Sequence, residues 1–175
     1  MLEFSQIVSS SDPYFDACWS LYNSAFPIEE RRDLDYHLEA MTRSAFKFNA
    51  LLDNGVLVGF FSFWDIDNFF YLEHLAIEEN FRNGGYGKKV LALLQSLTKK
   101  TIILEVEHPS DDIKKRRIGF YERNGFLLND YVYNQPPYSG EQYVSLLLMT
   151  YPRLVDKMEF DSFVKDSLPI VHFRL

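Results

Sequence analysis

Apolar positions near the start of the chain recur every three or four residues, as on the buried face of a helix. This face comprises Phe15, Cys18, Trp19, Tyr22, Ala25 and Phe26. Pro27 ends the pattern, because proline cannot continue a helix interior. The charged residues that follow open a second, polar helix, which we expect to run from Glu29 to about Arg43.

Two runs of aliphatic and aromatic residues come next, at 46–52 and 56–65. Their composition is typical of strands. Asn54-Gly55 lies between them, and this dipeptide is a strong signal for a tight hairpin turn. The sequence therefore predicts an antiparallel hairpin over residues 46–65.

Strand-like and helix-like segments alternate in the second half of the chain. The strand-like runs are at 69–77, 101–107, 126–133 and 142–150, and the helix-like segments are at 84–99 and 111–124. A hairpin followed by alternating strands and helices is typical of a mixed sheet covered on both faces. We expect an α/β (α+β) domain over residues 1–150, with a helix near 161–167 and a tail, residues 151–175, packed on the same domain.

A glycine-rich turn separates the strand at 69–77 from the next helix, and it reads Phe81-Arg82-Asn83-Gly84-Gly85-Tyr86-Gly87-Lys88. A turn of this kind before a helix points unpaired main-chain N–H groups at an anion, and glycine lets the main chain approach it closely. The turn has neither the Gly-x-Gly-x-x-Gly of dinucleotide sites nor the Gly-Lys-Ser/Thr of the P-loop. It therefore predicts a site for a phosphorylated ligand of another kind.

Composition narrows the class of protein. The 175 residues are 47% hydrophobic and 17% aromatic, which is ample material for a packed core. The formal net charge of −7 argues against a nucleic-acid partner, which would require clustered lysine and arginine. An acidic protein suits a cationic partner, such as an amine.

Cysteine content and hydropathy bear on the compartment. Cys18 is the single cysteine, so we expect no disulfide framework, and the histidines have no spacing typical of a metal site. We see no secretory signal at the start and no apolar run near the roughly 18–20 residues that span a bilayer. We therefore expect a cytoplasmic protein without a metal ion or a membrane partner.

The pattern Arg82-x-x-Gly85-x-Gly87 resembles the pyrophosphate loop of the GCN5-related N-acetyltransferases, the GNAT family, which bind acetyl-coenzyme A (acetyl-CoA). Two further segments resemble this family in the same order: His74-Leu75-Ala76-Ile77 before the loop and Phe120-Tyr121-Glu122-Arg123-Asn124-Gly125-Phe126 after it. The resemblance covers roughly residues 55–150. It implies a mixed, mostly antiparallel sheet of about seven strands flanked by helices on both faces.

The resemblance also implies which residues bind acetyl-CoA. Main-chain amides of the turn would hold the diphosphate, with help from the charges of Arg82 and Lys88, and the pantetheine arm would lie along the preceding strand. The expected cosubstrate-binding residues are Leu75, Ala76, Ile77, Arg82, Asn83, Gly84, Gly85, Tyr86, Gly87 and Lys88. A bulge in that strand would free one N–H group to stabilise the oxyanion.

Amine acetylation needs a base for the ammonium proton and an acid for the departing thiolate. Glu105 and Glu73 each interrupt an apolar strand, and both remain candidates for the base. Tyr121 matches the family's general acid by resemblance. We expect His74 to be packed and hydrogen-bonded rather than catalytic.

By resemblance, residues 26–33 and 133–140 frame the acceptor site. We expect an acetyl-CoA-dependent N-acetyltransferase that moves the acetyl group directly to a primary amine of a small molecule. Two alternatives stay open: a non-catalytic CoA-binding sensor, and an acetyltransferase of protein or peptide N-termini. The apolar tail either covers a sheet edge or pairs two subunits into a homodimer.

Overall fold

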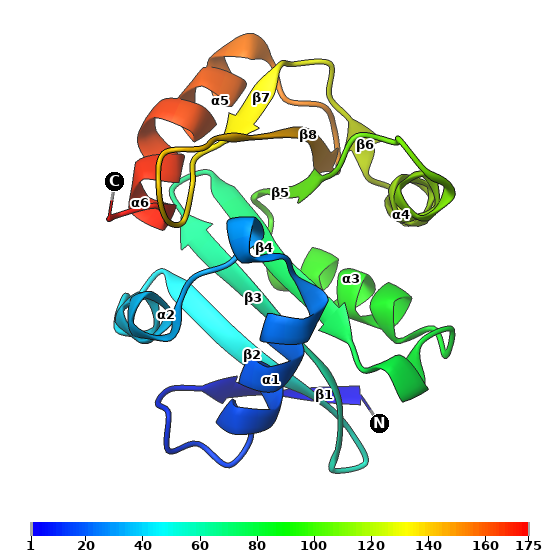
Figure 1. The fold of residues 1–175 in the computed structure, drawn as a ribbon. Coiled ribbons are helices and arrows are strands. Elements are labelled where there is room, and N and C mark those ends of the chain that lie inside the picture. Colours follow the sequence, from blue (N-terminus) through cyan, green and yellow to red (C-terminus); the bar gives the residue numbers. More distant parts are fainter. Residues whose placement is uncertain (1, 175) are drawn as a thin grey trace. The chain divides into compact units, whose positions relative to one another are not determined.

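The computed structural model describes residues 2–174, and the chain divides into two compact units (Figure 1). The first unit contains the chain up to Asp65 together with Leu72–Leu94. The second contains Ile66–Tyr71 and the chain from Gln95 onward. Eight mostly antiparallel strands and their flanking helices confirm the predicted mixed α/β class, with one strand more than the expected seven within residues 2–174. The predicted boundary at residue 150 stays a prediction.

The strands of the first unit follow one another in space as they do in sequence. They are β1 (Leu2–Ile7), β2 (Phe46–Asp53), β3 (Val56–Ile66) and β4 (Phe69–Ile77), whose last six residues belong to this unit. β1 pairs antiparallel with β2, and β2 with β3. Asn54 and Gly55 have φ of 50° and 80°, the left-handed pair that a tight hairpin turn needs, so the predicted hairpin is confirmed.

The helices of the first unit are α1 (Phe15–Ala25), α2 (Leu34–Met41) and α3 (Tyr86–Leu97), with short 3₁₀ segments η1 (Ile28–Glu30) and η2 (Glu79–Phe81). The predicted start of the second helix at Glu29 was wrong. Asp33 caps α2 by accepting a hydrogen bond from the main-chain N–H of Tyr36 at 2.8 Å, so the helix begins after it. The residues before Asp33 form the η1 turn and an extended segment instead.

A glycine allows β3 and β4 to approach closely. A Cβ added at Gly59 would lie 2.3 Å from the main-chain oxygen of Ala76, so no other residue fits there without moving β4. Gly59 thereby fixes the position of the β4 segment along which the family resemblance places the pantetheine arm.

β8 (Val144–Tyr151) is the central strand of the second unit. It pairs antiparallel with each of the others, β5 (Thr101–Val106), β6 (Leu127–Leu128) and β7 (Tyr133–Gln135). The predicted continuous strand at 126–133 was wrong, because the chain leaves the ladder at Asn129. The Asn129 main-chain N–H donates to the Leu148 main-chain oxygen at 2.9 Å, and its side chain donates to the same oxygen at 3.2 Å and to Thr150 Oγ1 at 3.0 Å.

The helices of the second unit are α4 (Asp112–Glu122) and a C-terminal run of α5 (Lys157–Ser162), η3 (Phe163–Ser167) and α6 (Leu168–Val171). This run is longer than the expected helix near 161–167. Buried Phe163 contacts the rings of Phe69, Tyr71 and Tyr133, with ring centroids 5.5–6.4 Å apart. The tail is therefore part of this unit's core. Across residues 2–174, the helices lack the length and apolar character required to cross a membrane.

Candidate active site

The glycine-rich turn leaves several main-chain N–H donors without an acceptor in residues 2–174 at the start of α3. Asn83 and Gly85 adopt left-handed φ values of 64° and 76°. The N–H groups of Gly85, Tyr86, Gly87 and Lys88 make no hydrogen bond with the described residues, as expected for the first turn of a helix. Gly85 is exposed, and a Cβ there would meet nothing within 4 Å. Four donors at a positive helix end can therefore receive an anion.

Two side chains hold this turn in place. The Tyr86 hydroxyl donates to Asp53 Oδ2 at 2.8 Å, which fixes the start of α3 to the β2–β3 hairpin. Arg82 Nε donates to the main-chain oxygen of Ile77 at 3.2 Å, which ties the turn to the end of β4. The rest of the exposed Arg82 guanidinium makes no hydrogen bond with residues 2–174, so its charge can face a phosphate.

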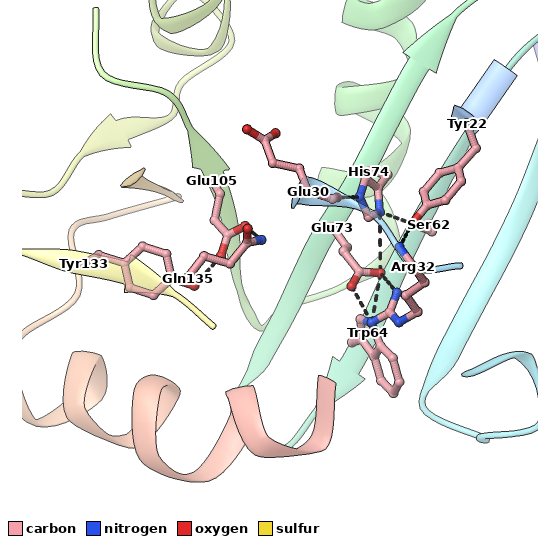
Figure 2. Close-up of polar contacts among 10 residues, drawn as sticks. All are labelled: Tyr22, Glu30, Arg32, Ser62, Trp64, Glu73, His74, Glu105, Tyr133 and Gln135. Atoms are coloured by element: carbon pink, nitrogen blue, oxygen red, sulfur yellow. Dashed lines mark hydrogen bonds and ion pairs between the residues drawn. The ribbon is translucent and has the colours of Figure 1, made fainter. Parts of the chain in front are cut away.

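Glu73, one of the two predicted bases, is enclosed by donors (Figure 2). Arg32 grips its carboxylate with both terminal nitrogens, at 2.6 Å and 2.9 Å, and Trp64 Nε1 donates to Oε2 at 3.1 Å. Arg32 is only 1% exposed and its guanidinium lies 5.1–5.6 Å from the centroids of three aromatic rings, those of Tyr36, Phe46 and Trp64. This is a buried, fork-like ion pair inside an aromatic cage.

The ion pair changes the basicity of Glu73. Burial alone would raise the pKa of its carboxyl, but the Arg32 charge and the donors around it hold that pKa well below its ordinary value. Such a carboxylate is a weak proton acceptor, and its side chain has no exposed surface. The surroundings of Glu73 are those of a structural anchor.

His74 is packed and hydrogen-bonded, as expected. Its Nε2 lies 2.9 Å from the main-chain oxygen of Glu30, and since a carbonyl can only accept, Nε2 carries the proton. Nδ1 is 3.3 Å from Ser62 Oγ, whose hydroxyl can donate to it. Together with the Arg32–Glu73 pair, His74 fastens the segment around η1 to β4 (Figure 2).

Glu105, the other predicted base, lies half-buried on β5 in the second unit. The Tyr133 hydroxyl donates to its Oε1, and Gln135 Nε2 donates to its Oε2 at 2.6 Å (Figure 2). Burial, followed by the neighbouring Glu105 charge and hydrogen bond, raises the pKa of the Tyr133 phenol well above its ordinary value. Tyr133 therefore stays protonated and acts as a donor to this carboxylate.

Tyr121, the predicted acid, lies on α4 with its ring against Phe120 and Phe126, at centroid distances of 5.2 Å and 5.7 Å. Its hydroxyl makes no hydrogen bond with the part of the chain that the structure describes. Burial raises its pKa, and the nearby Arg117 charge opposes that rise. The phenol is therefore neutral at pH 7 and has a proton to donate.

The first unit brings together the predicted cosubstrate-binding residues of β4 and the turn, and the second unit holds Glu105 and Tyr121. The sequence did not identify Arg32 as the partner of Glu73 or Gln135 as a partner of Glu105. Arg32 lies in a charged run, and nothing in the sequence distinguishes it from its neighbours. Tyr133 and Gln135 are two positions apart, and this spacing could have indicated that they lie on the same face of a strand. In residues 2–174, no three His, Cys, Asp or Glu side chains are grouped to hold a metal ion.

Comparison with known proteins places these features in a family. The sequence profile of the acetyltransferase (GNAT) family matches residues 15–126. The chain is 36% identical to a solved protein from Bacteroides thetaiotaomicron that is assigned to the GNAT acetyltransferases, with a TM-score of 0.89 over 97% of this chain and 98% of that one. A comparison with curated proteins found no match.

Two less similar solved structures share the fold. One is a chimeric spermidine N-acetyltransferase from Vibrio cholerae and hSSAT, 14% identical, with a TM-score of 0.62 over 85% of this chain and 93% of that chain. The other is a GNAT acetyltransferase from Elizabethkingia anophelis with acetyl-CoA bound, 14% identical, with a TM-score of 0.58 over 85% and 96% of the two chains. The profile match and the 36% identical relative show that this chain belongs to the GNAT family of acetyltransferases.

Proposed function

We propose that this acetyltransferase uses acetyl-CoA to acetylate a primary amine of a small molecule by direct transfer. The observation that carries the proposal is the set of four main-chain donors at residues 85–88. A diphosphate fits them, because it supplies several charged acceptors to a positive helix end. Acetyl-CoA supplies the activated acetyl group as a thioester when it is bound.

Glu105 is the residue that we assign to the acceptor's ammonium group. It is half-buried, and two neutral side chains, Tyr133 and Gln135, donate hydrogen bonds to its carboxylate. A free alkylammonium has a pKa of roughly 10, so it must lose a proton before its nitrogen can attack. Glu105 attracts the cation and receives that proton, directly or through one water molecule.

Tyr121 supplies the second proton. As the amine nitrogen bonds to the acetyl carbon, the carbon–sulfur bond breaks, the sulfur leaves with the electron pair, and the nitrogen loses its second proton to solvent. The Tyr121 hydroxyl donates its proton to this sulfur and is reprotonated from solvent. The balance is one ammonium and one thioester consumed, and one amide, one thiol and one proton released.

Direct transfer is supported by the state of the one cysteine. Cys18 is 0% exposed in the core of the first unit, and burial raises the pKa of its thiol to about 12. A neutral, inaccessible thiol does not form an acyl intermediate. We also infer a cytoplasmic location, since Cys18 forms no disulfide.

A small cationic acceptor is supported by the net charge of −7 and by the Glu105 carboxylate. The test measures thiol release from acetyl-CoA with two panels, one of amines that includes spermidine and amino sugars, and one of peptides with free N-termini. Turnover with an amine supports the proposal. Turnover with peptides alone contradicts the acceptor class, and CoA binding without turnover in either panel indicates a sensor.

A further inference from the structure

The backbone of the second unit brings Glu105, Tyr133 and Gln135 to one face of its sheet. Glu105 is opposite Leu148 on β8, whereas Tyr133 and Gln135 are opposite Leu146 and Val144 on the same strand. Alternate residues of a strand point to one face, and residues directly opposite each other share a face. The shared strand β8 therefore aligns three side chains from two other strands.

The two partners of Glu105 are more deeply buried than Glu105 itself. Tyr133 is 2% exposed and Gln135 is 3% exposed, whereas Glu105 is half-buried. Tyr133 donates a hydrogen bond to Oε1 of Glu105, and Gln135 donates one to Oε2. Donors held in a packed core cannot follow a moving side chain, so they restrict the carboxylate to one orientation.

Hydrogen bonds to a carboxylate stabilise its charged form more than its protonated form. Tyr133 cannot take the proton from Glu105, since its phenol is already protonated and its own ionisation is strongly disfavoured. Gln135 cannot ionise at all. The hydrogen bonds from Tyr133 and Gln135 therefore stabilise the negative charge on Glu105, and neither donor carries a charge itself.

We propose that Tyr133 and Gln135 are positioning residues for acetyl transfer, which hold the Glu105 carboxylate ionised and correctly oriented to receive the acceptor's ammonium group. This inference rests on the proposed function, because it gives Glu105 the acceptor side of the reaction. It adds two residues to which the family resemblance assigned no such role. Both act through Glu105.

The test is a double-mutant cycle with acetyl-CoA and, as acceptor probes, spermidine and n-butylamine. Tyr133→Phe and Gln135→Leu each remove one donor to the carboxylate. We expect each to lower kcat/KM for the amine by roughly 10- to 100-fold while the KM for acetyl-CoA stays unchanged. In a Glu105→Gln background, the same changes cost less than about twofold, because no carboxylate is left to hold.

Tyr131→Phe is the matched control. Tyr131 is a neighbouring tyrosine whose hydroxyl donates to the main-chain oxygen of Val155 rather than to Glu105. We expect Tyr131→Phe to leave kcat/KM within about twofold of the wild-type value, because it removes no hydrogen bond to Glu105. An equal loss for Tyr133→Phe in both backgrounds would make Tyr133 a purely structural residue and overturn the inference.

A second measurement needs no acceptor. In protein with ¹³C-labelled glutamate carboxyls, the Glu105 signal is identified by its loss in Glu105→Gln, and its pKa is read from a pH titration. We expect this pKa to rise in Tyr133→Phe and in Gln135→Leu, because each variant loses a hydrogen bond to the charged form. No rise in either variant overturns the inference, even if Glu105→Gln is inactive. Full activity of Glu105→Gln would instead contradict the proposed function.

Discussion

Arg32 and Glu73 are 41 positions apart in the chain, yet both terminal nitrogens of Arg32 contact the Glu73 carboxylate, at 2.6 Å and 2.9 Å. Both side chains are removed from solvent. One lies just after the η1 turn and the other on β4, so the pair fixes the segment between α1 and α2 to β4. This pair gives Glu73 a structural role, and the catalytic role expected for it stays a prediction.

Glu73→Gln leaves the Arg32 charge buried without its counter-ion. We therefore expect it to lower the free energy of unfolding by about 3–5 kcal/mol, as measured by urea denaturation. Glu39→Gln, which removes the exposed pair with Arg43, is the control and should change it far less. A Glu73→Gln variant as stable as the wild type would contradict the role of this pair.

Gly85→Ala tests the left-handed turn at the start of α3, where φ is 76°. A Cβ is strained at this φ and lies beside the donors, so we expect the Kd for CoA to rise about tenfold or more in a calorimetric titration. Gly140→Ala is the matched control, since φ is 74° there and a Cβ also meets nothing within 4 Å. Equal losses of affinity in the two variants would mean that the effect is general destabilisation.

His37 gives the stability a pH dependence. It is 1% exposed, both ring nitrogens lack a hydrogen bond within residues 2–174, and burial, followed by the Arg32 charge, lowers its pKa to about 3. The folded state therefore excludes a proton that the unfolded state binds below about pH 6.5. The contribution of neutral His37 to the free energy of unfolding is complete above about pH 6.5 and is lost as the pH falls toward 3.

Between pH 7 and pH 5, protonation of His37 in the unfolded state lowers the wild type's free energy of unfolding by about 2 kcal/mol. His37→Leu removes the titrating group. The free energy of unfolding of the variant, relative to that of the wild type, should therefore be about 2 kcal/mol higher at pH 5 than at pH 7. Urea denaturation at both pH values measures it. A difference that does not depend on pH would show that His37 binds its proton equally well in the folded and unfolded states.

Tyr121→Phe removes the proton donor but keeps the ring that packs on Phe126. We expect kcat to fall by about 10²- to 10⁴-fold, with little change in the Kd for CoA or in thermal stability. Tyr151→Phe is the control, since Tyr151 also packs on Phe126, at 5.6 Å. Unchanged turnover in Tyr121→Phe would mean that another group protonates the thiolate.

Features set by neighbouring residues could be predicted from the sequence. The Asn54-Gly55 turn, the Asp111 cap of α4 and the left-handed Gly125 beyond that helix all depend on a few adjacent positions. The glycine-rich turn before α3 belongs to this class as well. Each of these residues has a conformational or capping preference of its own, which acts before any tertiary contact forms.

Features set by distant contacts could not be predicted. The Asn129 side chain contacts Leu148 and Thr150, which are 19 and 21 positions away, at the point where a strand with a continuous apolar pattern ends. The choice between Glu73 and Glu105 depended on partners far away in sequence, Arg32 in one case and Gln135 in the other. Charge and spacing along the chain do not show which carboxylate becomes enclosed.

We propose that the main-chain N–H groups of residues 85–88 bind the diphosphate of CoA. Amide ¹⁵N–¹H spectra recorded during a titration with coenzyme A test it directly. We predict that the signals of Gly85, Tyr86, Gly87 and Lys88 shift most and follow one binding curve. Saturable binding of CoA that leaves these four signals in place would contradict the account.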